Sequence, residues 1–178
     1  NIFSDKEGKP TDEFFSFIGG LQAHLPAAMS MLAPYVNSYR RLTRYSVAPI
    51  NVAWGYDNRT TGLRIPPSEP SARRVENRIP SSDANPYLAI AASLACGLLG
   101  LEEGLKPSEP VLGSAYSLDY DLPRGILEAA TALEESEALT SIFGESFVRT
   151  YTAVKRAEFE TFMEVISPWE REFLLLNV

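Results

Sequence analysis

The chain has 178 residues, 45% of them hydrophobic and 22% charged, which suits one folded domain with a sizeable core. Its formal net charge of -7 and its pI near 4.8 argue against general nucleic-acid binding, which normally needs a basic domain. No uninterrupted apolar run reaches about 18 residues and the N-terminus lacks a basic-then-apolar pattern, so neither a membrane span nor a signal peptide is expected.

The first predicted elements are helical. Thr11 suits an N-cap, and apolar residues recur at helical spacing from Phe14 to Leu21. Gly19-Gly20 is expected to weaken the middle of this helix. A second helical stretch follows Pro26 and ends before Pro34.

Three segments then have strand character. They are Ile50 to Trp54, Thr61 to Ile65 and Arg73 to Ile79, and the turn-prone Tyr56-Asp57-Asn58 joins the first two. The simplest arrangement is an antiparallel set of short strands.

The second half of the chain is predicted to be helical. From Asn85 about 18 residues are apolar on nearly every side, which predicts a buried helix. After a loop rich in Pro, Gly and Tyr come four further helices, at Ile126 to Leu133, Ser136 to Phe143, Glu145 to Ile166 and Pro168 to Leu176. The expected fold class is α+β, with antiparallel strands in the first half packed with helices.

Single residues and the two ends add further expectations. The lone Cys96 excludes an internal disulfide, fits a reducing cytoplasm and suits an inert core position. His24, the only histidine, has no partner at ligand spacing and is expected to be structural. Because the chain starts at Asn1 in a hydrophilic stretch, we expect the C-terminal piece of a longer protein. The apolar run Phe173–Leu176 is expected in the core.

Arginines concentrate in one window of this acidic chain. Between positions 40 and 78 it carries eight of its twelve arginines, no lysine and only three carboxylates, a local balance of +5: Arg40, Arg41, Arg44, Arg59, Arg64, Arg73, Arg74 and Arg78. Arginine stays protonated and forks onto planar oxyanions. The window therefore predicts a site for phosphate or carboxylate groups.

The third predicted strand indicates which ligands that site would bind. Alternate strand residues share a face, so Arg74, Glu76 and Arg78 are expected to project together. A carboxylate between two arginines suits Mg²⁺ or Mn²⁺ beside a phosphoryl group. The alternative is a surface ladder of mutually neutralised charges. Further arginines without matching acids would repel one another unless an anion were present, which favours the binding site.

Several motifs in this order and at these gaps resemble the C-terminal half of the catalytic domain of the glutamine synthetase superfamily: residues 37–42 (NSYRRL), Ala48-Pro49, residues 58–60 (NRT) leading to residues 64–66 (RIP), residues 72–78 (ARRVENR) and residues 85–89 (NPYLA). The resemblance covers residues 1–178. It implies that a small β-grasp domain and the first half of the catalytic domain precede this portion, and that the full-length protein forms a homo-oligomeric ring, a dodecamer.

The resemblance also implies roles for individual residues. Glu76 would bind the Mg²⁺ or Mn²⁺ that bridges the phosphates of ATP. Arg41 and Arg78 would hold the substrate glutamate. Arg59, Arg64 and Arg74 would contact the ATP phosphates or the transferred phosphoryl group, with Arg59 catalytic. The family reaction makes a γ-glutamyl phosphate, from which a nitrogen nucleophile displaces phosphate.

Two departures from the ammonia-using pattern set the expected substrate. A glutamate that handles ammonium precedes Ala-Pro in those enzymes, whereas Val47 stands there in this chain. A small apolar residue leaves room for an alkylamine, so the chain looks most like the γ-glutamylputrescine synthetase branch. Ser71 stands where those enzymes often have a lysine, which puts nucleotide contacts at that position in doubt. Trp54 and Tyr56 could line an amine pocket, since aromatic faces attract cations, and strand core is the alternative for Trp54.

The expected function is therefore an ATP-dependent ligase that joins glutamate to a putrescine-like amine in the cytoplasm, without nucleic acid or membrane partners. The isolated portion is expected to be inactive, because the other metal ligands would lie upstream. Glutamine synthesis from ammonia is one alternative. A non-catalytic structural homologue is the other.

Overall fold

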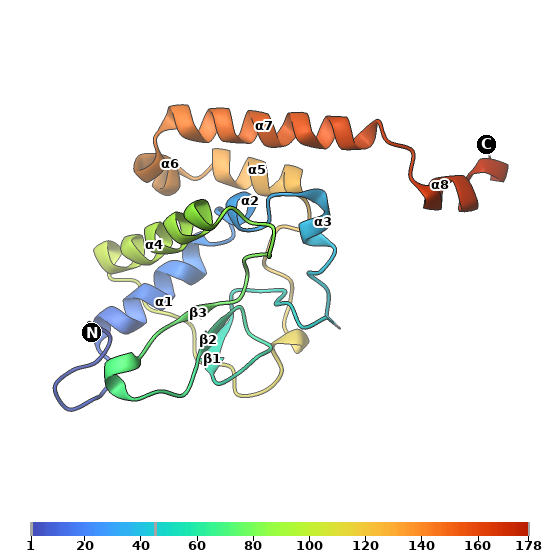
Figure 1. Ribbon diagram of the computed structural model, residues 1–178. Coiled ribbons are helices and arrows are strands. Elements are labelled where there is room, and N and C mark those ends of the chain that lie inside the picture. The colour runs from blue at the N-terminus through green and yellow to red at the C-terminus, as the bar shows by residue number, and fades with distance from the viewer. Residues whose placement is uncertain (1, 45, 178) are drawn as a thin grey trace.

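The computed structural model describes residues 2–44 and 46–177, so Asn1, Tyr45 and Val178 lie outside the described residues. The described helices are α1 (Asp12–His24), α2 (Met29–Leu32), α3 (Val36–Tyr39), α4 (Pro86–Glu103), α5 (Ile126–Glu134), α6 (Glu137–Phe143), α7 (Glu145–Met163) and α8 (Pro168–Phe173). The strands are β1 (Trp54–Tyr56), β2 (Leu63–Ile65) and β3 (Glu76–Asn77). In Figure 1 the sheet lies at one end, α1 and α4 lie in the middle, and α5 to α7 form a layer at the other end. The α+β class is confirmed.

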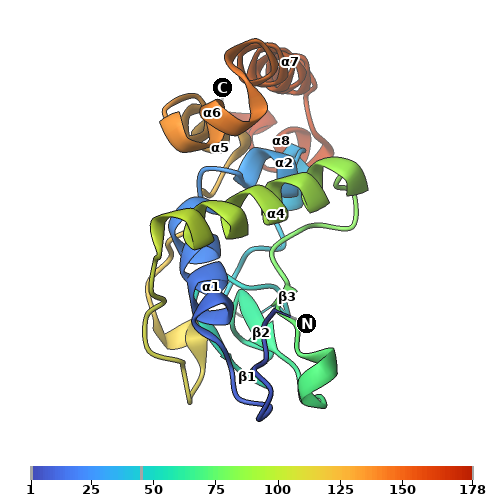
Figure 2. The same ribbon diagram turned by 90° about the vertical axis from the view of Figure 1, so that its left-hand side faces the viewer.

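Helices α1 and α4 cross each other (Figure 2), and Gly20 and Gly100 lie at their contact. The Thr11 hydroxyl caps α1 by accepting from the Phe14 amide at 3.2 Å, as predicted. A Cβ atom added at Gly20 would lie 2.3 Å from the Cys96 carbonyl oxygen and 2.5 Å from the Cα of Gly100. The Gly19-Gly20 pair, expected to weaken α1, thus contains the residue that lets the two helix backbones approach closely.

Helix α4 is buried on one side only. Its N-terminus is capped by the Asn85 side chain, and its α1-facing side includes the buried Cys96. Ile90 and Leu94 are 60% and 58% exposed, so the expectation of a helix buried on every side is wrong. Among the described helices, α4 alone is apolar and long enough to cross a membrane, and 33% of that segment is buried. Its glycine-mediated packing on α1 is that of a core helix.

The sheet is mixed, which corrects the expected antiparallel set. β2 and β3 pair antiparallel, but β1 and β2 pair parallel, with Trp54 opposite Leu63 and Tyr56 opposite Ile65. Parallel neighbours usually need a long crossover, whereas here residues 57–62 make the return.

Contacts outside the sheet shape this short return. Asp57 takes a positive φ of 46°. The Asn58 side chain donates to the carbonyls of Val111 at 3.0 Å and Gly113 at 2.8 Å. At Gly62 a Cβ atom would lie 2.3 Å from the Asn51 carbonyl oxygen, so the chain passes directly beside the segment that leads into β1. These contacts bring β2 back alongside β1 in the same direction.

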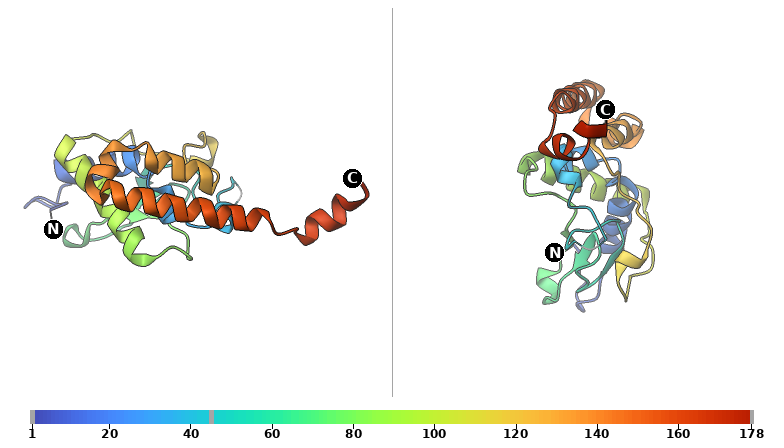
Figure 3. Two further views of the ribbon diagram at one scale, coloured as in Figure 1. Left: turned by 90° about the horizontal axis from the view of Figure 1, so that it is seen from above. Right: turned by 90° about the vertical axis from the view of Figure 1, so that its right-hand side faces the viewer.

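The C-terminal end of the chain leaves the body of the molecule. α5 and α7 pack together, whereas α8 projects beyond them (Figures 1 and 3). Trp169 and Phe173 stack on each other at 5.4 Å, and Leu176 is 94% exposed. The expectation that residues 173–176 enter the core is therefore wrong, since no described helix covers them.

An ion pair links α5 to α7 and gives a pH-dependent prediction. Arg156 Nη2 lies 2.6 Å from Glu134 Oε2, and this hydrogen bond lowers the pKa of Glu134 below its ordinary 4.5. Its stabilisation is present above that value and is lost as pH falls through the lower folded-state pKa. We expect Glu134→Gln to reduce the free energy of unfolding by about 0.2–1 kcal/mol at neutral pH, because the pair is partly exposed.

Urea unfolding of both chains between about pH 7 and pH 3.5 measures this difference, which is expected to shrink at the acidic end. Glu160→Gln on α7 serves as the control, because Glu160 is exposed and forms no ion pair with a described residue. A difference in unfolding free energy between the two chains that stays constant with pH would contradict the prediction.

Candidate active site

One face of the sheet carries an arginine between two carboxylates. Arg64 on β2 lies directly opposite Glu76 on β3, and its Nη1 is 2.7 Å from Glu76 Oε2. Its Nη2 is 2.5 Å from Oδ1 of Asp57, which follows β1. These hydrogen bonds, which Arg64 donates to Asp57 and Glu76, raise the pKa of Arg64. The tertiary fold thus pairs Arg64 with carboxylates on both sides.

Arg78 connects the other side of Glu76 to two loops. Its Nε lies 3.9 Å from Glu76 Oε1. Its guanidinium also donates to backbone carbonyl oxygens of Arg59, of Thr61 at 3.1 Å, and of Val47 at 3.0 Å. Arg78 therefore brings together β3, the 57–62 return and the segment that carries Val47.

Arg41 adds a half-buried cation with an unused donor. It is half-buried and donates from Nη2 to the Ile79 carbonyl. Its buried Nε has no hydrogen-bond partner among the described residues. Burial lowers the pKa of Arg41; the charge of Asp83 opposes this shift and that of Arg78 adds to it. An anion at Arg41 would satisfy the donor and offset the repulsion.

Two predicted site residues lie at the edge of this cluster. Arg59 is exposed, and its guanidinium forms no hydrogen bond or ion pair with the described residues. Arg74 is exposed and donates to the Ala72 carbonyl at 3.3 Å. The expected row of Arg74, Glu76 and Arg78 on one strand face needs correction, because a 3₁₀ turn at Pro70–Ala72 precedes a strand of only two residues. Strand register therefore places Arg64, not Arg74, beside Glu76.

Other arginines of the window serve the fold. Arg73 donates to the Phe3 carbonyl at 3.1 Å and to the Gly8 carbonyl at 2.9 Å, which fixes the N-terminal segment. Arg44 donates to the Tyr116 carbonyl at 3.1 Å. The arginine window is thus not a uniform set of anion-binding residues.

Glu76 is a single carboxylate rather than a complete metal site. No group of three or more His, Cys, Asp or Glu side chains that could hold a metal ion occurs within residues 2–44 and 46–177. The carboxylate fits one ligand position of a hard cation, next to arginines that suit phosphate. The remaining oxygen ligands would have to come from phosphates, water or another part of a longer protein.

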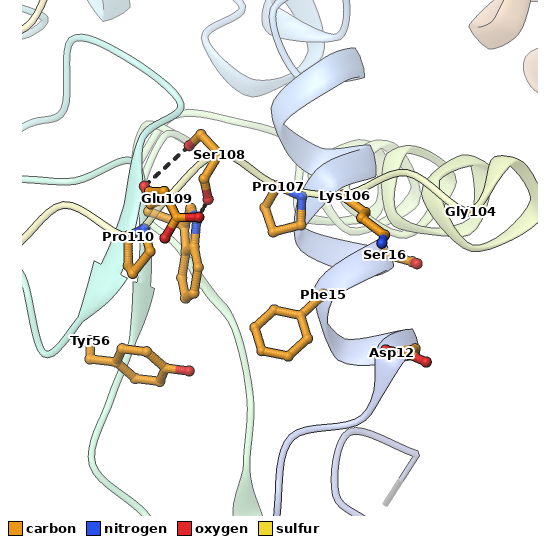
Figure 4. Close-up of a pocket in the computed structure, with 11 residues that line it drawn as sticks. Asp12, Phe15, Ser16, Tyr56, Gly104, Lys106, Pro107, Ser108, Glu109 and Pro110 are labelled. Atoms are coloured by element: carbon orange, nitrogen blue, oxygen red, sulfur yellow. Dashed lines mark hydrogen bonds between the residues drawn. The ribbon is translucent and has the colours of Figure 1, made fainter.

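The opposite face of the sheet holds a separate cavity of about 680 Å³ between α1, β1 and the loop after α4 (Figure 4). Phe15 and Tyr56 line it. Trp54 is 2% exposed and donates from Nε1 to the Ser108 carbonyl at 2.7 Å. Register puts Trp54 and Tyr56 on the face away from Arg64 and Glu76. Trp54 is therefore buried strand core that also lines this cavity with Tyr56, and neither ring lines the arginine cluster.

Two candidates that sequence patterns set aside are structural. His24 Nε2 lies 3.8 Å from Glu103 Oε1, across the α1–α4 contact. Burial raises the pKa of Cys96 to about 12, which leaves the thiol protonated and inert. Conversely, sequence reasoning gave no role to Asp57, which pairs with Arg64, or to Asp83, which accepts from the Ser38 hydroxyl at 3.0 Å near Arg41. In the sequence, only the negative charge of these two residues could have indicated that they lie near arginines.

The fold and the cluster define an α+β domain with arginines and carboxylates gathered on one face of its sheet. Residues 1–174 match the family model described as "Glutamine synthetase, catalytic domain", and the chain belongs to this family. This is a family of ligases that join glutamate to an amine or ammonia.

Relatives within the family differ in the nitrogen substrate that their names state. The chain is 40% identical over 175 residues to a glutamate–isopropylamine ligase of a Pseudomonas species, covering 95% of this chain and 38% of the relative. It is 37% identical over 179 residues to the gamma-glutamylputrescine synthetase PuuA of Escherichia coli (strain K12), covering 99% and 38%. Several glutamine synthetases match at 31–38% identity.

A solved structure supports the fold. The structure described as "GmaS/ADP complex-Conformation 1" superposes with a TM-score of 0.85 at 33% identity, covering 98% of this chain and 42% of that one. The chain thus spans about two fifths of the length of the proteins it matches.

Proposed function

We propose that this chain is the C-terminal portion, residues 1–178, of the catalytic domain of an ATP-dependent ligase that joins the γ-carboxylate of glutamate to a small amine. The observation that carries the proposal is the convergence of Arg64 and Arg78 on Glu76 from separate segments, with Arg41 and its unpaired buried donor close enough to feel the charge of Arg78. Family membership over nearly the whole chain supports it.

The reaction divides the cluster between two anions. Arg41 and Arg78 hold the carboxylates of glutamate, while Arg59, Arg64 and Arg74 neutralise the phosphates of ATP. A γ-carboxylate oxygen attacks the γ-phosphorus and ADP leaves; the amine nitrogen then attacks the carbonyl carbon (Cδ) of the acyl phosphate, loses a proton, and phosphate leaves. Fixed guanidinium groups favour both steps, because negative charge develops on oxygens that they already face.

Glu76 contributes one carboxylate ligand to a divalent cation, Mg²⁺ or Mn²⁺, which supplies charge neutralisation at the phosphates when it is bound. In the chain by itself, the same carboxylate is held by Arg64 at 2.7 Å. Arg64 therefore sets the direction in which the second oxygen of Glu76 points.

The nitrogen substrate is assigned from Val47. Its side chain is 87% exposed, and its carbonyl is bound to Arg78, so this residue stands beside the proposed glutamate site. A valine offers no charge for ammonium and no base for its proton. Relatives named for isopropylamine and putrescine support an alkylamine, with a putrescine-like diamine as our specific proposal.

Replacing Val47 by glutamate in an enzyme of the relatives' full length tests this assignment. We expect the ratio of kcat/KM for ammonium over putrescine to rise by about 10²-fold, because a carboxylate there would both bind ammonium and accept its proton. Phosphate release with putrescine, isopropylamine and ammonium measures the ratio. Val47→Gln is the matched control, because glutamine has nearly the same size as glutamate but no charge. Ammonium as the better substrate of the unaltered enzyme would favour glutamine synthesis instead.

The remaining properties are proposed for the whole protein. It would act in the cytoplasm as a homo-oligomeric ring, a dodecamer, and the isolated 178-residue chain would be inactive for want of further metal ligands. A non-catalytic homologue is disfavoured, because Arg41, Arg78 and Glu76 are all retained and brought together.

A further inference from the structure

A tyrosine outside the predicted site holds the segment that carries Val47. The Tyr116 hydroxyl lies 2.6 Å from the Ser46 carbonyl oxygen and 3.2 Å from that of Ala48, so its proton is shared between them. The carbonyl oxygen of Val47, which lies between those two in the chain, accepts a hydrogen bond from Arg78 Nη2 at 3.0 Å. Three successive carbonyl oxygens of residues 46–48 are therefore bound by two side chains from distant parts of the chain.

The position of Tyr116 is itself fixed by the loops of the site. It belongs to a 3₁₀ turn, Ala115–Ser117, whose first residue is fully buried. Asn51 donates to the Ala115 carbonyl at 2.9 Å, and the Ala115 amide donates to Thr60 Oγ1 at 2.8 Å. Both partners flank β1 and β2. The tyrosine thus stands on backbone anchored to the same sheet that carries Arg64.

The segment on which Tyr116 acts is buried at Ala48, which is 6% exposed, but Val47 is exposed. The Ser46 hydroxyl donates within the same loop, to the Arg41 carbonyl at 2.5 Å, and the Val47 side chain contributes no packing at 87% exposure. Side-chain hydrogen bonds to backbone, together with the buried Ala48 that follows, therefore set where residue 47 points. Without the hydrogen bonds, residues 46 and 47 would sample several positions relative to Arg78.

We infer that Tyr116 is a positioning residue for amine selection. It holds residues 46–48 so that the Val47 side chain forms one wall of the amine site, next to Arg78. This inference rests on the proposed function for its consequence, but the restraint itself is a property of this chain. A single hydroxyl at position 116 thereby couples the 3₁₀ turn to the discrimination between an alkylamine and ammonium.

The restraint is tested on the chain by hydrogen exchange in Tyr116→Phe, which deletes the hydroxyl and keeps the ring. Amides of residues 46–48 are expected to exchange about 5-fold faster or more, while those of α1 and α4 stay unchanged. Tyr120→Phe is the matched control: its ring contacts Arg44 and Arg124, but its hydroxyl donates to no described residue. Unchanged exchange at residues 46–48 would overturn the inference.

The consequence is tested in an enzyme of the relatives' full length. Tyr116→Phe is expected to raise KM for the amine about 5-fold to 10-fold, leave KM for ATP unchanged, and lower the preference for alkylamine over ammonium. An equal loss in kcat with every nitrogen substrate would instead mean a general structural role and would overturn the inference. Absence of ligase activity in the unaltered enzyme, with faster exchange in the variant, would refute the proposed function and the selection role but not the restraint.

Discussion

Replacing Glu76 by alanine in an enzyme of the relatives' full length is expected to lower kcat/KM for ligation by about 10³-fold. The carboxylate lies 2.7 Å from Arg64 and 3.9 Å from Arg78, so its loss leaves both cations without the charge between them. In the proposed reaction it also removes a metal ligand. Phosphate release with ATP varied, at saturating glutamate and amine, measures the effect, and Glu76→Gln is expected to lose nearly as much, because the amide has no charge.

The fold of the chain should survive this change. Glu76 is partly exposed, so the alanine variant is expected to lose no more than about 1 kcal/mol of unfolding free energy in urea titrations of the chain. Glu69→Ala is the matched control, since Glu69 is an exposed acid in the same stretch. Ligase activity retained in the Glu76 variant would remove the metal role and most of the case for the proposed function.

The second large effect is expected at the crossing of α1 and α4. Gly20→Ala should destabilise the chain by about 1–3 kcal/mol. The added methyl would lie 2.3 Å from the Cys96 carbonyl oxygen and 2.5 Å from the Cα of Gly100, and both of these atoms belong to the backbone of α4. In an exposed helix interior, alanine is more favourable than glycine by about 1 kcal/mol. Helix propensity alone would therefore make Gly20→Ala stabilising, so a loss of stability would come from the contact between the helices. Thermal unfolding followed by circular dichroism should show a fall of about 2–4 °C per kcal/mol.

Gly113→Ala provides the comparison for this crossing. A Cβ atom at Gly113 meets no heavy atom within 4 Å, so the melting temperature of the Gly113→Ala chain should stay close to that of the unaltered chain. Gly20→Val, with a larger side chain, is expected to prevent folding. A Gly20→Ala chain as stable as Gly113→Ala would show that the two helices separate without loss, contrary to the packing described above.

Local signals in the sequence predicted the helices well. Thr11 and Asn85 cap α1 and α4 as their side chains indicate, because a cap needs only an oxygen and the amides two or three residues later. The direction of the β1–β2 pairing was predicted wrongly, since the two strands run parallel rather than antiparallel. The parallel direction depends on Asn58 reaching Val111 and Gly113, more than fifty positions away, which no local pattern records.

Which apolar surface is covered was also beyond the sequence. Helix α4 is apolar nearly all round, yet only the face toward α1 is buried, while Ile90 and Leu94 stay exposed. Residues 173–176 have the composition of a core but project with α8 (Figure 3). Composition gives the tendency of a segment to be buried, whereas burial itself needs a partner surface at the right place.

The sequence by itself determined the residue types of the cluster, since eight arginines against three acids fall in one window, and from this imbalance it predicts anionic ligands. Only the tertiary structure decided what each arginine does. Arg73 and Arg44 bind backbone carbonyls about seventy positions away, whereas Arg64 and Arg78 flank Glu76. A guanidinium forms bonds with whichever oxygens the folded backbone brings within about 3 Å, and that choice is made by strand register and loop path rather than by neighbouring residues.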